Sequence, residues 1–288
     1  MAMTAAALGR IGIWATELRW SDPGEISEAA AELEQLGYGA LWFPGGIGGD
    51  VTGDFSRLLD ATNRIPVATG IINIWKHEPD EIAAWWLGLP ETQRSRALLG
   101  LGISHGPLIG EAWGKPLPVT RAYVERLTAA GVPAEHQCLA ALGPKMLELA
   151  RDRTLGSHPY LATPEHTAMA RAILGPGKLL APEQGVILET DPDRARSIGR
   201  EALATYLALP NYRNNWLRVG FSEAEIESQA DRLIDGLFAW GEPARIAERV
   251  HEHHAAGADH VCLQVLQATG RDLAAARGAW RQLAAELL

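Results

Sequence analysis

Cysteine is scarce in this chain, which has only Cys138 and Cys262 among its 288 residues. Both lie in apolar, strand-like runs, so two reduced core thiols are expected, with a disulfide between strands as the alternative. An excess of positive charge is also lacking, because 26 Lys and Arg stand against 35 Asp and Glu, a net charge of −9. Since nucleic-acid binding needs clustered cations, this balance argues against a nucleic-acid partner.

Long hydrophobic runs are missing as well. No stretch approaches the roughly 18 apolar residues of a membrane span. The first residues, MAMTAAALG, lack the basic start and the apolar core of a secretory signal. Hydrophobic residues nevertheless make up 47% of the chain, enough for a large core. A soluble, cytoplasmic protein with no membrane partner is the expectation.

Several catalytic and binding motifs are absent. The glycine-rich runs at 44–49 and 100–102 follow apolar strands but give neither a dinucleotide-binding G-x-G-x-x-G nor a phosphate-binding P-loop. There is no G-x-S-x-G nucleophile elbow. His251, His253 and His254 look like metal ligands, but they end a helix that runs into a strand, which places them on the face away from an active site. No metal site is expected.

What the chain does contain is a repeated strand–helix rhythm. Near-continuous apolar runs, typical of strands buried on both faces, alternate with amphipathic helices such as ISEAAAELEQL. Eight strands are counted, at 10–16, 39–44, 66–75, 97–104, 137–142, 156–161, 185–190 and 258–266. Eight is the number that closes a parallel barrel, so we expect one (β/α)8 barrel domain, a TIM barrel, over residues 1–288.

One segment breaks this rhythm. Residues 210–222, PNYRNNWLRVGFS, are too long and too aromatic for a plain connector. They are expected to form an insertion after strand seven near the active-site mouth, with packing filler as the alternative.

Three histidines fall at the carboxyl ends of expected strands, where a barrel gathers its chemistry. His77 follows strand three, His105 follows strand four and His158 lies in strand six. Each could instead fill a gap, but together they form a plausible acid–base set. His158 is the first candidate because Gly156 and Pro159 restrain the backbone around it; His105 and His77 follow.

The ordered pieces resemble the luciferase-like monooxygenase superfamily, and within it the oxidoreductases that use the deazaflavin coenzyme F420. The resemblance rests on motifs spread over nearly the whole chain, TGIINIW, LGLGISH, LAALGPKMLELA, GSHPYLATPEHTAMAR, LPNYRNNWLRVGF and AGADHVCLQVL. Acidic residues of the sugar-phosphate dehydrogenases in this superfamily are missing here, so catalytic roles from those relatives do not transfer.

The resemblance implies where a coenzyme would lie. It places the ring across the carboxyl-end mouth, against a strand-three bulge with a cis peptide bond at Gly70-Ile71. The tail lies near the Gly-Pro turn after strand five. Carried over to this chain, the expected cofactor-binding residues are Gly70, Ile71, Ile72, Ser104, Gly143, Pro144, Lys145 and Tyr160.

The expected function is hydride transfer between coenzyme F420 and a small organic substrate. An FMN-dependent monooxygenase of the same fold is the alternative, and a barrel that binds a flavin without turnover is a third possibility. The resemblance also implies a homodimer.

Overall fold

The computed structural model describes residues 3–46, 48–104, 114–268 and 270–288. Within these residues, ten parallel strands form one curled sheet in the order β7-β6-β5-β4-β3-β2-β1-β10-β8-β9. The strands are β1 (Ile11–Trp14), β2 (Leu41–Gly45), β3 (Val67–Asn73), β4 (Ala97–Gly102), β5 (Gln137–Leu139), β6 (Gly156–Ser157), β7 (Leu179–Leu180), β8 (Glu183–Ile187), β9 (Phe238–Trp240) and β10 (Val261–Val265).

The sheet closes into a barrel because β7 and β8 together occupy one of its strand positions. Each such strand position is called a stave below. Only Ala181 and Pro182 separate them. On one edge the Ala181 N–H donates to the Ser157 carbonyl of β6, at 2.9 Å. On the other edge the Cys262 N–H of β10 donates to the Pro182 carbonyl, also at 2.9 Å. Counted this way, eight staves surround one axis, which confirms the expected (β/α)8 barrel.

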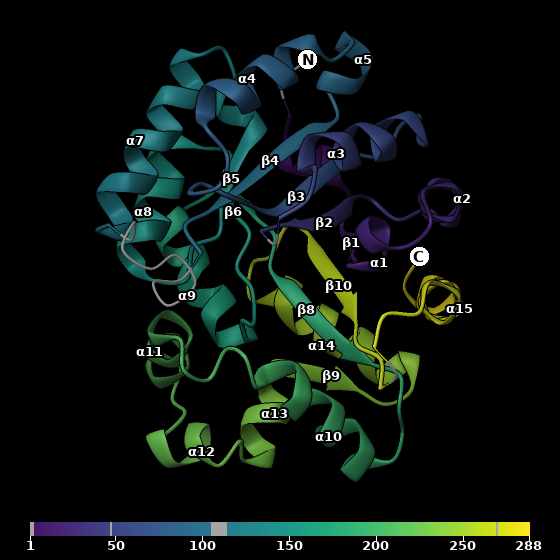
Figure 1. Cartoon of the computed structure of the whole chain (residues 1–288). Helices are drawn as coiled ribbons and strands as arrows, with labels where there is room; N and C mark the ends of the chain where they lie inside the picture. The colour runs from purple at the N-terminus through teal and green to yellow at the C-terminus, as the bar shows by residue number, and fades with distance from the viewer. Residues whose placement is uncertain (1–2, 47, 105–113, 269) are drawn as a thin grey trace.

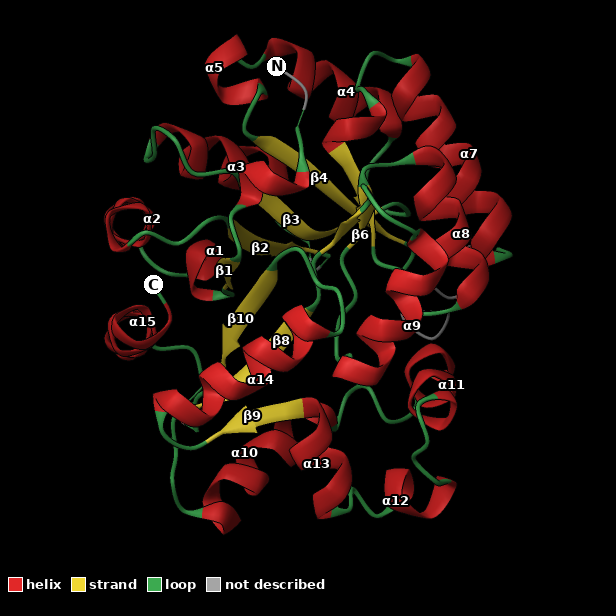
Figure 2. Ribbon diagram, turned by 180° about the vertical axis from the view of Figure 1, so that it is seen from behind, coloured by secondary structure: helices red, strands yellow, loops and turns green. Residues whose placement is uncertain are grey.

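Helices surround this barrel, and α10 to α13 gather at one end beside β8 and β9 (Figures 1 and 2). The helices are η1 (Ala5–Leu8), α1 (Glu17–Trp20), α2 (Pro23–Leu36), α3 (Val51–Asp60), α4 (Pro79–Gly88), α5 (Glu91–Arg94), α7 (Pro116–Ala129), η3 (Ala134–His136), α8 (Pro144–Arg153), α9 (Pro164–Leu174), α10 (Pro192–Leu203), α11 (Pro210–Arg218), α12 (Glu223–Glu227), α13 (Asp231–Leu237), α14 (Pro243–Ala255) and α15 (Leu273–Leu287). None is long and apolar enough to cross a membrane, among the residues described.

Local sequence explains many helix ends. The Asp22 side chain accepts the N–H groups of Gly24 and Glu25 and so caps α2, which ends at Gly37 with φ 95°. Thr163 caps α9 in the same way by accepting the His166 N–H. Proline occupies the first turn of α2 and α9, where its missing N–H costs nothing.

The insertion after strand seven is present and larger than expected. It occupies residues 188–242 and consists of α10 to α13 with β9. The expectation that residues 210–222 are irregular is wrong, because Pro210–Arg218 forms α11. The insertion has its own hydrophobic core, in which Trp216, Leu233 and Leu237 are almost fully buried. It is joined to the barrel through β9, which pairs with β8.

Two strand boundaries also differ from expectation. The sixth strand ends at Ser157 rather than at residue 161, because Pro159 follows and Leu161 takes φ 51°. The seventh stave begins at Leu179 rather than at residue 185. This earlier start brings Glu183 into the barrel wall.

Side chains fill the barrel from inside. Trp42, Cys138 and Cys262 belong to one interior cluster and are fully buried. Both cysteines are free thiols. A larger cluster packs the outer faces of the strands against the helices. The carboxyl ends of the strands are therefore held on a rigid support, as a site built there requires.

Candidate functional site

The most irregular strand of the barrel is β3. Its pairing register shifts against both neighbours, β2 and β4, around residues 69–71. The Gly70-Ile71 peptide bond is cis, as the sequence resemblance implied. Gly70 and Ile71 are partly exposed, whereas the other five residues of the strand are buried. The bulge thus presents a patch of backbone and the Ile71 side chain at the mouth.

Two side chains support this bulge from behind. The indole N–H of Trp14 donates to the Gly70 carbonyl at 3.2 Å. A Cβ added at Gly70 would lie 2.1 Å from Trp14 Nε1 and 2.8 Å from His158 Nε2. Glycine at position 70 is therefore required by close approach of both side chains.

His158 lies inside the barrel wall and is 1% exposed. Its Nδ1 lies 2.7 Å from the Ala181 carbonyl, and its ring stacks on Trp42 with centroids 4.2 Å apart. Burial lowers the pKa of His158 to about 4, against a smaller opposing effect of the Ala181 carbonyl. The expectation that His158 titrates near neutrality therefore needs correction. A neutral ring with Nδ1–H bound to a carbonyl leaves Nε2 as an acceptor facing the bulge.

Of the other two candidate histidines, His105 and His77, only His77 can be compared with His158. His105 lies outside the described residues. His77 follows β3 and is partly buried, and its Nε2 has no hydrogen-bond partner among the described residues. Its pKa is lowered by burial first and then by the charges of Arg19 and Lys76. Within the described part of the chain, no hydrogen bond or ring contact joins His77 to His158.

Next to the bulge, β5 leads through a turn into α8. The helix begins at Pro144, and its N-cap Gly143 supplies no side-chain cap. A Cβ added at Gly143 would meet nothing within 4 Å, so the space beside it is open. Lys145, in the first turn, is exposed. A helix start without a side-chain cap, the helix dipole and a lysine together suit an anionic group such as a phosphate.

Ser104 lies two residues after the neighbouring strand β4, which ends at Gly102. Ser104 is partly exposed and takes φ 61°, which is uncommon for a residue with a side chain. The expected cofactor-binding residues of strands three, four and five therefore lie within or after adjacent strands, β3, β4 and β5. This arrangement fits a flat ring over the bulge with an anionic tail toward α8.

Tyr160 lies on the opposite side, among aromatic residues. Its ring centroid is 5.8 Å from that of Trp14 and 5.5 Å from that of Tyr206. Its hydroxyl donates to Gln264 Oε1 at 2.9 Å, which connects the loop after β6 to the end of β10. Tyr160 thus contacts residues of β1 and β10, and through Trp14 it is linked to the Gly70 carbonyl of the β3 bulge.

Two buried acids were missed by reading the sequence. Glu183 is 1% exposed, and burial raises its pKa to about 8, although the Leu161 N–H opposes this shift. Glu17, after β1, is 5% exposed, and burial raises its pKa too. An acid inside an apolar run, LLAPEQGVIL, was the available signal for Glu183. A start of strand seven at residue 185 hid it.

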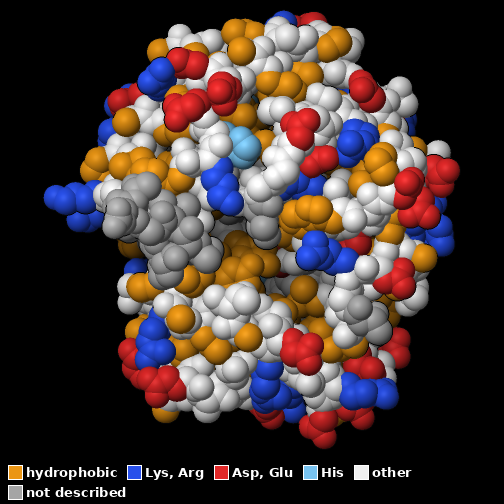
Figure 3. Space-filling model, in the orientation of Figure 1, with side chains coloured by type: hydrophobic (Ala, Val, Ile, Leu, Met, Phe, Trp, Pro, Cys, Tyr) orange, Lys and Arg blue, Asp and Glu red, His pale blue; other side chains and the backbone are white. Residues whose placement is uncertain are grey.

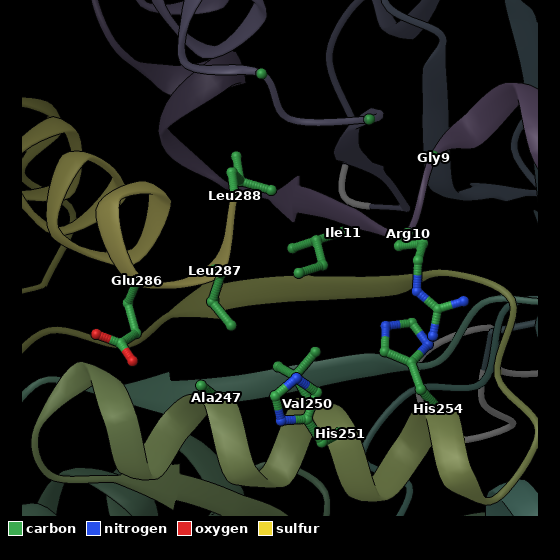
Figure 4. Close-up of a pocket in the computed structure, with 12 residues that line it drawn as sticks. Gly9, Arg10, Ile11, Ala247, Val250, His251, His254, Glu286, Leu287 and Leu288 are labelled. Atoms are coloured by element: carbon green, nitrogen blue, oxygen red, sulfur yellow. The ribbon is translucent and has the colours of Figure 1, made fainter.

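The histidine-rich helix end belongs to the other face of the barrel. His251 and His254 line a groove of about 440 Å³ together with Gly9, Arg10 and Ile11, which precede or begin β1 (Figure 4). His253 is fully buried and bonds to Thr167 and Gln184. No group of metal-ligand side chains occurs among the described residues.

Comparison with known proteins agrees with this architecture. The family model described as luciferase-like monooxygenase matches residues 2–131. A Mycobacterium tuberculosis protein provisionally named as a coenzyme F420-dependent oxidoreductase is 27% identical over 121 residues. That alignment covers 40% of this chain and 33% of the relative, so the chain aligns with only a third of its length.

Solved structures match over almost the whole chain. An F420-dependent secondary alcohol dehydrogenase with an F420–acetone adduct gives a TM-score of 0.72 at 15% identity, covering 99% of both chains. The F420-dependent tetrahydromethanopterin reductase of Methanopyrus kandleri gives 0.72 at 16% identity, with 99% of both chains covered. The oxygenating constituent of 3,6-diketocamphane monooxygenase from Pseudomonas putida, with FMN, gives 0.65 at 13% identity, covering 100% of this chain and 99% of that one.

At such identities the structural matches establish the fold alone. Residues 2–131 match the luciferase-like monooxygenase family model, and the chain as a whole has the fold of the F420-dependent and FMN-containing enzymes named above.

Proposed function

We propose that the protein transfers a hydride between coenzyme F420 and a small organic substrate. One observation carries this proposal. The bulge at Gly70-Ile71 is the exposed part of an otherwise buried strand, and it lies at the same strand edge as the uncapped start of α8. A deazaflavin has a flat ring and an anionic tail, and these two surfaces suit those two parts.

The residues of this chain would position the coenzyme and leave the redox chemistry to it. When bound, the coenzyme supplies or accepts the hydride. Gly70 and Ile71 would contact the ring, and Gly143 and Lys145 would hold the phosphate and the acidic tail. Ile72, also expected at the ring, is 1% exposed and packs in the core between strands and helices instead. Trp14 and His158 would fix the bulge through the contacts described above.

FMN is the second candidate because it also has a flat ring and a phosphate. Similarity to an FMN-containing monooxygenase supports it, whereas the two F420 enzymes and the mycobacterial relative support F420. The longer acidic tail of F420 would use Lys145 beyond the phosphate, which FMN would not.

Parallel titrations distinguish the two coenzymes. The purified protein is titrated with F420 and with FMN while coenzyme fluorescence is followed. Tighter binding of F420, with turnover of the bound deazaflavin in a substrate screen, supports the proposal. Preference for FMN with oxygen consumption would support a monooxygenase, and coenzyme binding without turnover of any substrate would support a non-catalytic binder.

A further inference from the structure

The mouth of the barrel has a second half beyond the residues in or after β3, β4 and β5 that would hold the coenzyme. Opposite these residues lie the ends of β1 and β10, the loop after β6 and the insertion. Trp14 borders both halves, because its indole N–H donates to the Gly70 carbonyl. If the proposed function holds, this second half faces the substrate. The surface is hollowed above the insertion, and hydrophobic side chains are visible in the hollow (Figure 3).

Aromatic rings from four segments form a connected wall in this half. Trp14 comes from β1, Tyr160 from the loop after β6, Tyr206 from the segment after α10 and Tyr212 from α11. Successive ring centroids along this series are 5.8, 5.5 and 5.1 Å apart. Trp14 and Tyr212 are buried, so Tyr160 and Tyr206 supply the accessible part of this wall, with their hydroxyl groups at its edges.

One carboxamide is oriented within this wall. Gln264 is partly exposed at the end of β10, and its Oε1 accepts the Tyr160 hydroxyl at 2.9 Å. Because Oε1 is engaged, the Nε2 amide group is left to donate. Over the ranges that the structure describes, no recorded hydrogen bond uses Gln264 Nε2. A donor held in one orientation beside an apolar wall selects for a ligand with an acceptor at the matching place.

Several charged groups around this wall already have partners, and the pKa of the buried acids is raised. Burial raises the pKa of Glu183 to about 8, and of Glu17 as well, so Glu183 is neutral at pH 7. Arg19 of α1 pairs with Asp54 at 2.7 Å. Arg213 of α11 pairs with Glu223 and with Glu227. Arg218 donates to Asn215 Oδ1 at 3.4 Å. A charged ligand would compete with the ion-pair partners of Arg19 and Arg213, and an uncharged one would not. Within the described residues Arg218 has only a neutral partner, so its effect on anions is measured with the benzoate probe below.

We infer that this half of the mouth binds an uncharged carbonyl or hydroxyl compound with a flat, apolar body. Gln264 Nε2 donates to its oxygen and determines specificity, and Tyr160 is a positioning residue that orients the carboxamide. The inference rests on the proposed function only for the identity of this ligand as the substrate. The binding preference itself is a property of the chain.

Three probe ligands of similar size distinguish what the aromatic ring, the acceptor oxygen and the charge each contribute to binding affinity. Acetophenone has the ring and an uncharged acceptor, ethylbenzene has the ring without oxygen, and benzoate has the ring with a negative charge. Their affinities for the full chain are measured by ligand-observed NMR titration at pH 7, with and without F420. Acetophenone is expected to bind at least tenfold more tightly than benzoate.

Variants then test whether the Gln264 side chain is the hydrogen-bond donor to the ligand. Gln264→Leu is expected to weaken acetophenone binding about tenfold and to leave ethylbenzene unchanged, because one hydrogen bond is lost. Tyr160→Phe keeps the ring and is expected to lower the acetophenone-to-ethylbenzene ratio by a smaller factor. Gln93→Leu is the control, since Gln93 bonds to Asp60 on the outer surface and should leave every affinity unchanged.

The inference is overturned if benzoate binds as tightly as acetophenone. It is also overturned if acetophenone does not bind up to its solubility limit, or if Gln264→Leu leaves the acetophenone affinity unchanged. Failure of the proposed function is a separate result, because absence of F420 binding is measured by coenzyme fluorescence and the probe affinities are measured without coenzyme as well.

Discussion

Glu183 holds Leu161 in place from inside the barrel. Its Oε2 accepts the Leu161 N–H at 3.2 Å, and the Leu161 carbonyl accepts the indole N–H of Trp216 at 3.3 Å. Leu161 takes φ 51°, which a side chain disfavours. One residue is therefore bound by the barrel on one side and by the insertion on the other, and the loop that carries Tyr160 is kept in a single position.

Replacing Glu183 with Gln should stabilise the protein at high pH. The folded-state pKa of about 8 lies above the ordinary value of 4.5, so the folded protein retains a proton that the unfolded chain releases. Wild-type stability therefore falls as pH rises from about 4.5 to about 8. Urea denaturation of Glu183→Gln at pH 5, 7 and 9 should show a growing advantage of several kcal/mol, at ~1.4 kcal/mol per pKa unit.

The other titratable groups near Glu183 are present in both proteins, and burial is the main cause of their raised pKa values, so most of their effect cancels in the comparison. They are Tyr160, Tyr206, Tyr212 and Cys262, and each has a raised pKa to which the charge of Glu183 contributes. Identical pH dependence in wild type and variant would show that Glu183 is ionised in the folded protein.

Gly70→Ala should destabilise the bulge. The added Cβ would lie 2.1 Å from Trp14 Nε1, so a side chain or the backbone must move. Overpacking of this kind costs about 1–3 kcal/mol. Gly143→Ala is the matched control, because nothing lies within 4 Å of its added Cβ and its φ is −86°. Thermal unfolding of both variants measures the loss of stability. An equal loss in Gly70→Ala and Gly143→Ala would contradict the prediction.

Lys145→Ala should weaken F420 binding by about 1–3 kcal/mol, as expected for a lost charged hydrogen bond. The loss should shrink at high salt because Lys145 is exposed. Arg151→Ala provides a control, since Arg151 carries the same charge in the last turn of the same helix. Fluorescence titration with F420 measures all three proteins. Equal effects of both substitutions would mean that only net charge matters.

His158→Asn should reduce F420 affinity and the hydride-transfer rate together, by about tenfold. The imidazole packs on Trp42 and faces Gly70, so its loss should loosen the surface under the ring. Because the pKa of His158 is about 4, the hydride-transfer rate of the wild type should not change near pH 6.5 through titration of this residue. A ~100-fold loss of rate with unchanged F420 affinity would instead make His158 the acid–base group.

Much of the fold was readable because its signals are local. Asp22 and Gly37 bound α2, and apolar runs located seven of the eight staves with small errors at their ends. The seventh stave was read from residue 185 because Pro182 interrupts the run. Pairing with Ser157 on one edge and with Cys262 on the other keeps this segment in the sheet, and those contacts join residues distant in sequence.

The site was less accessible to sequence reading. Proximity to a strand end identified His158, but only the Ala181 and Trp42 contacts show that its ring is neutral and turned toward Gly70. Glu183 and Gln264 were missed because their significance depends on burial and orientation. Residue type and spacing carry neither of these properties.

The pairing of β9 with β8 has a consequence for how ligands enter. Phe238, Ala239 and Trp240 align with Gly185, Val186 and Ile187, so the insertion continues the wall of the sheet. Swinging it outward as a hinged cover would break this ladder, at a cost of several backbone hydrogen bonds. Ligand exchange is therefore expected to depend on side-chain rotations at the mouth of the barrel, on the nanosecond scale, and not on slow opening of the insertion.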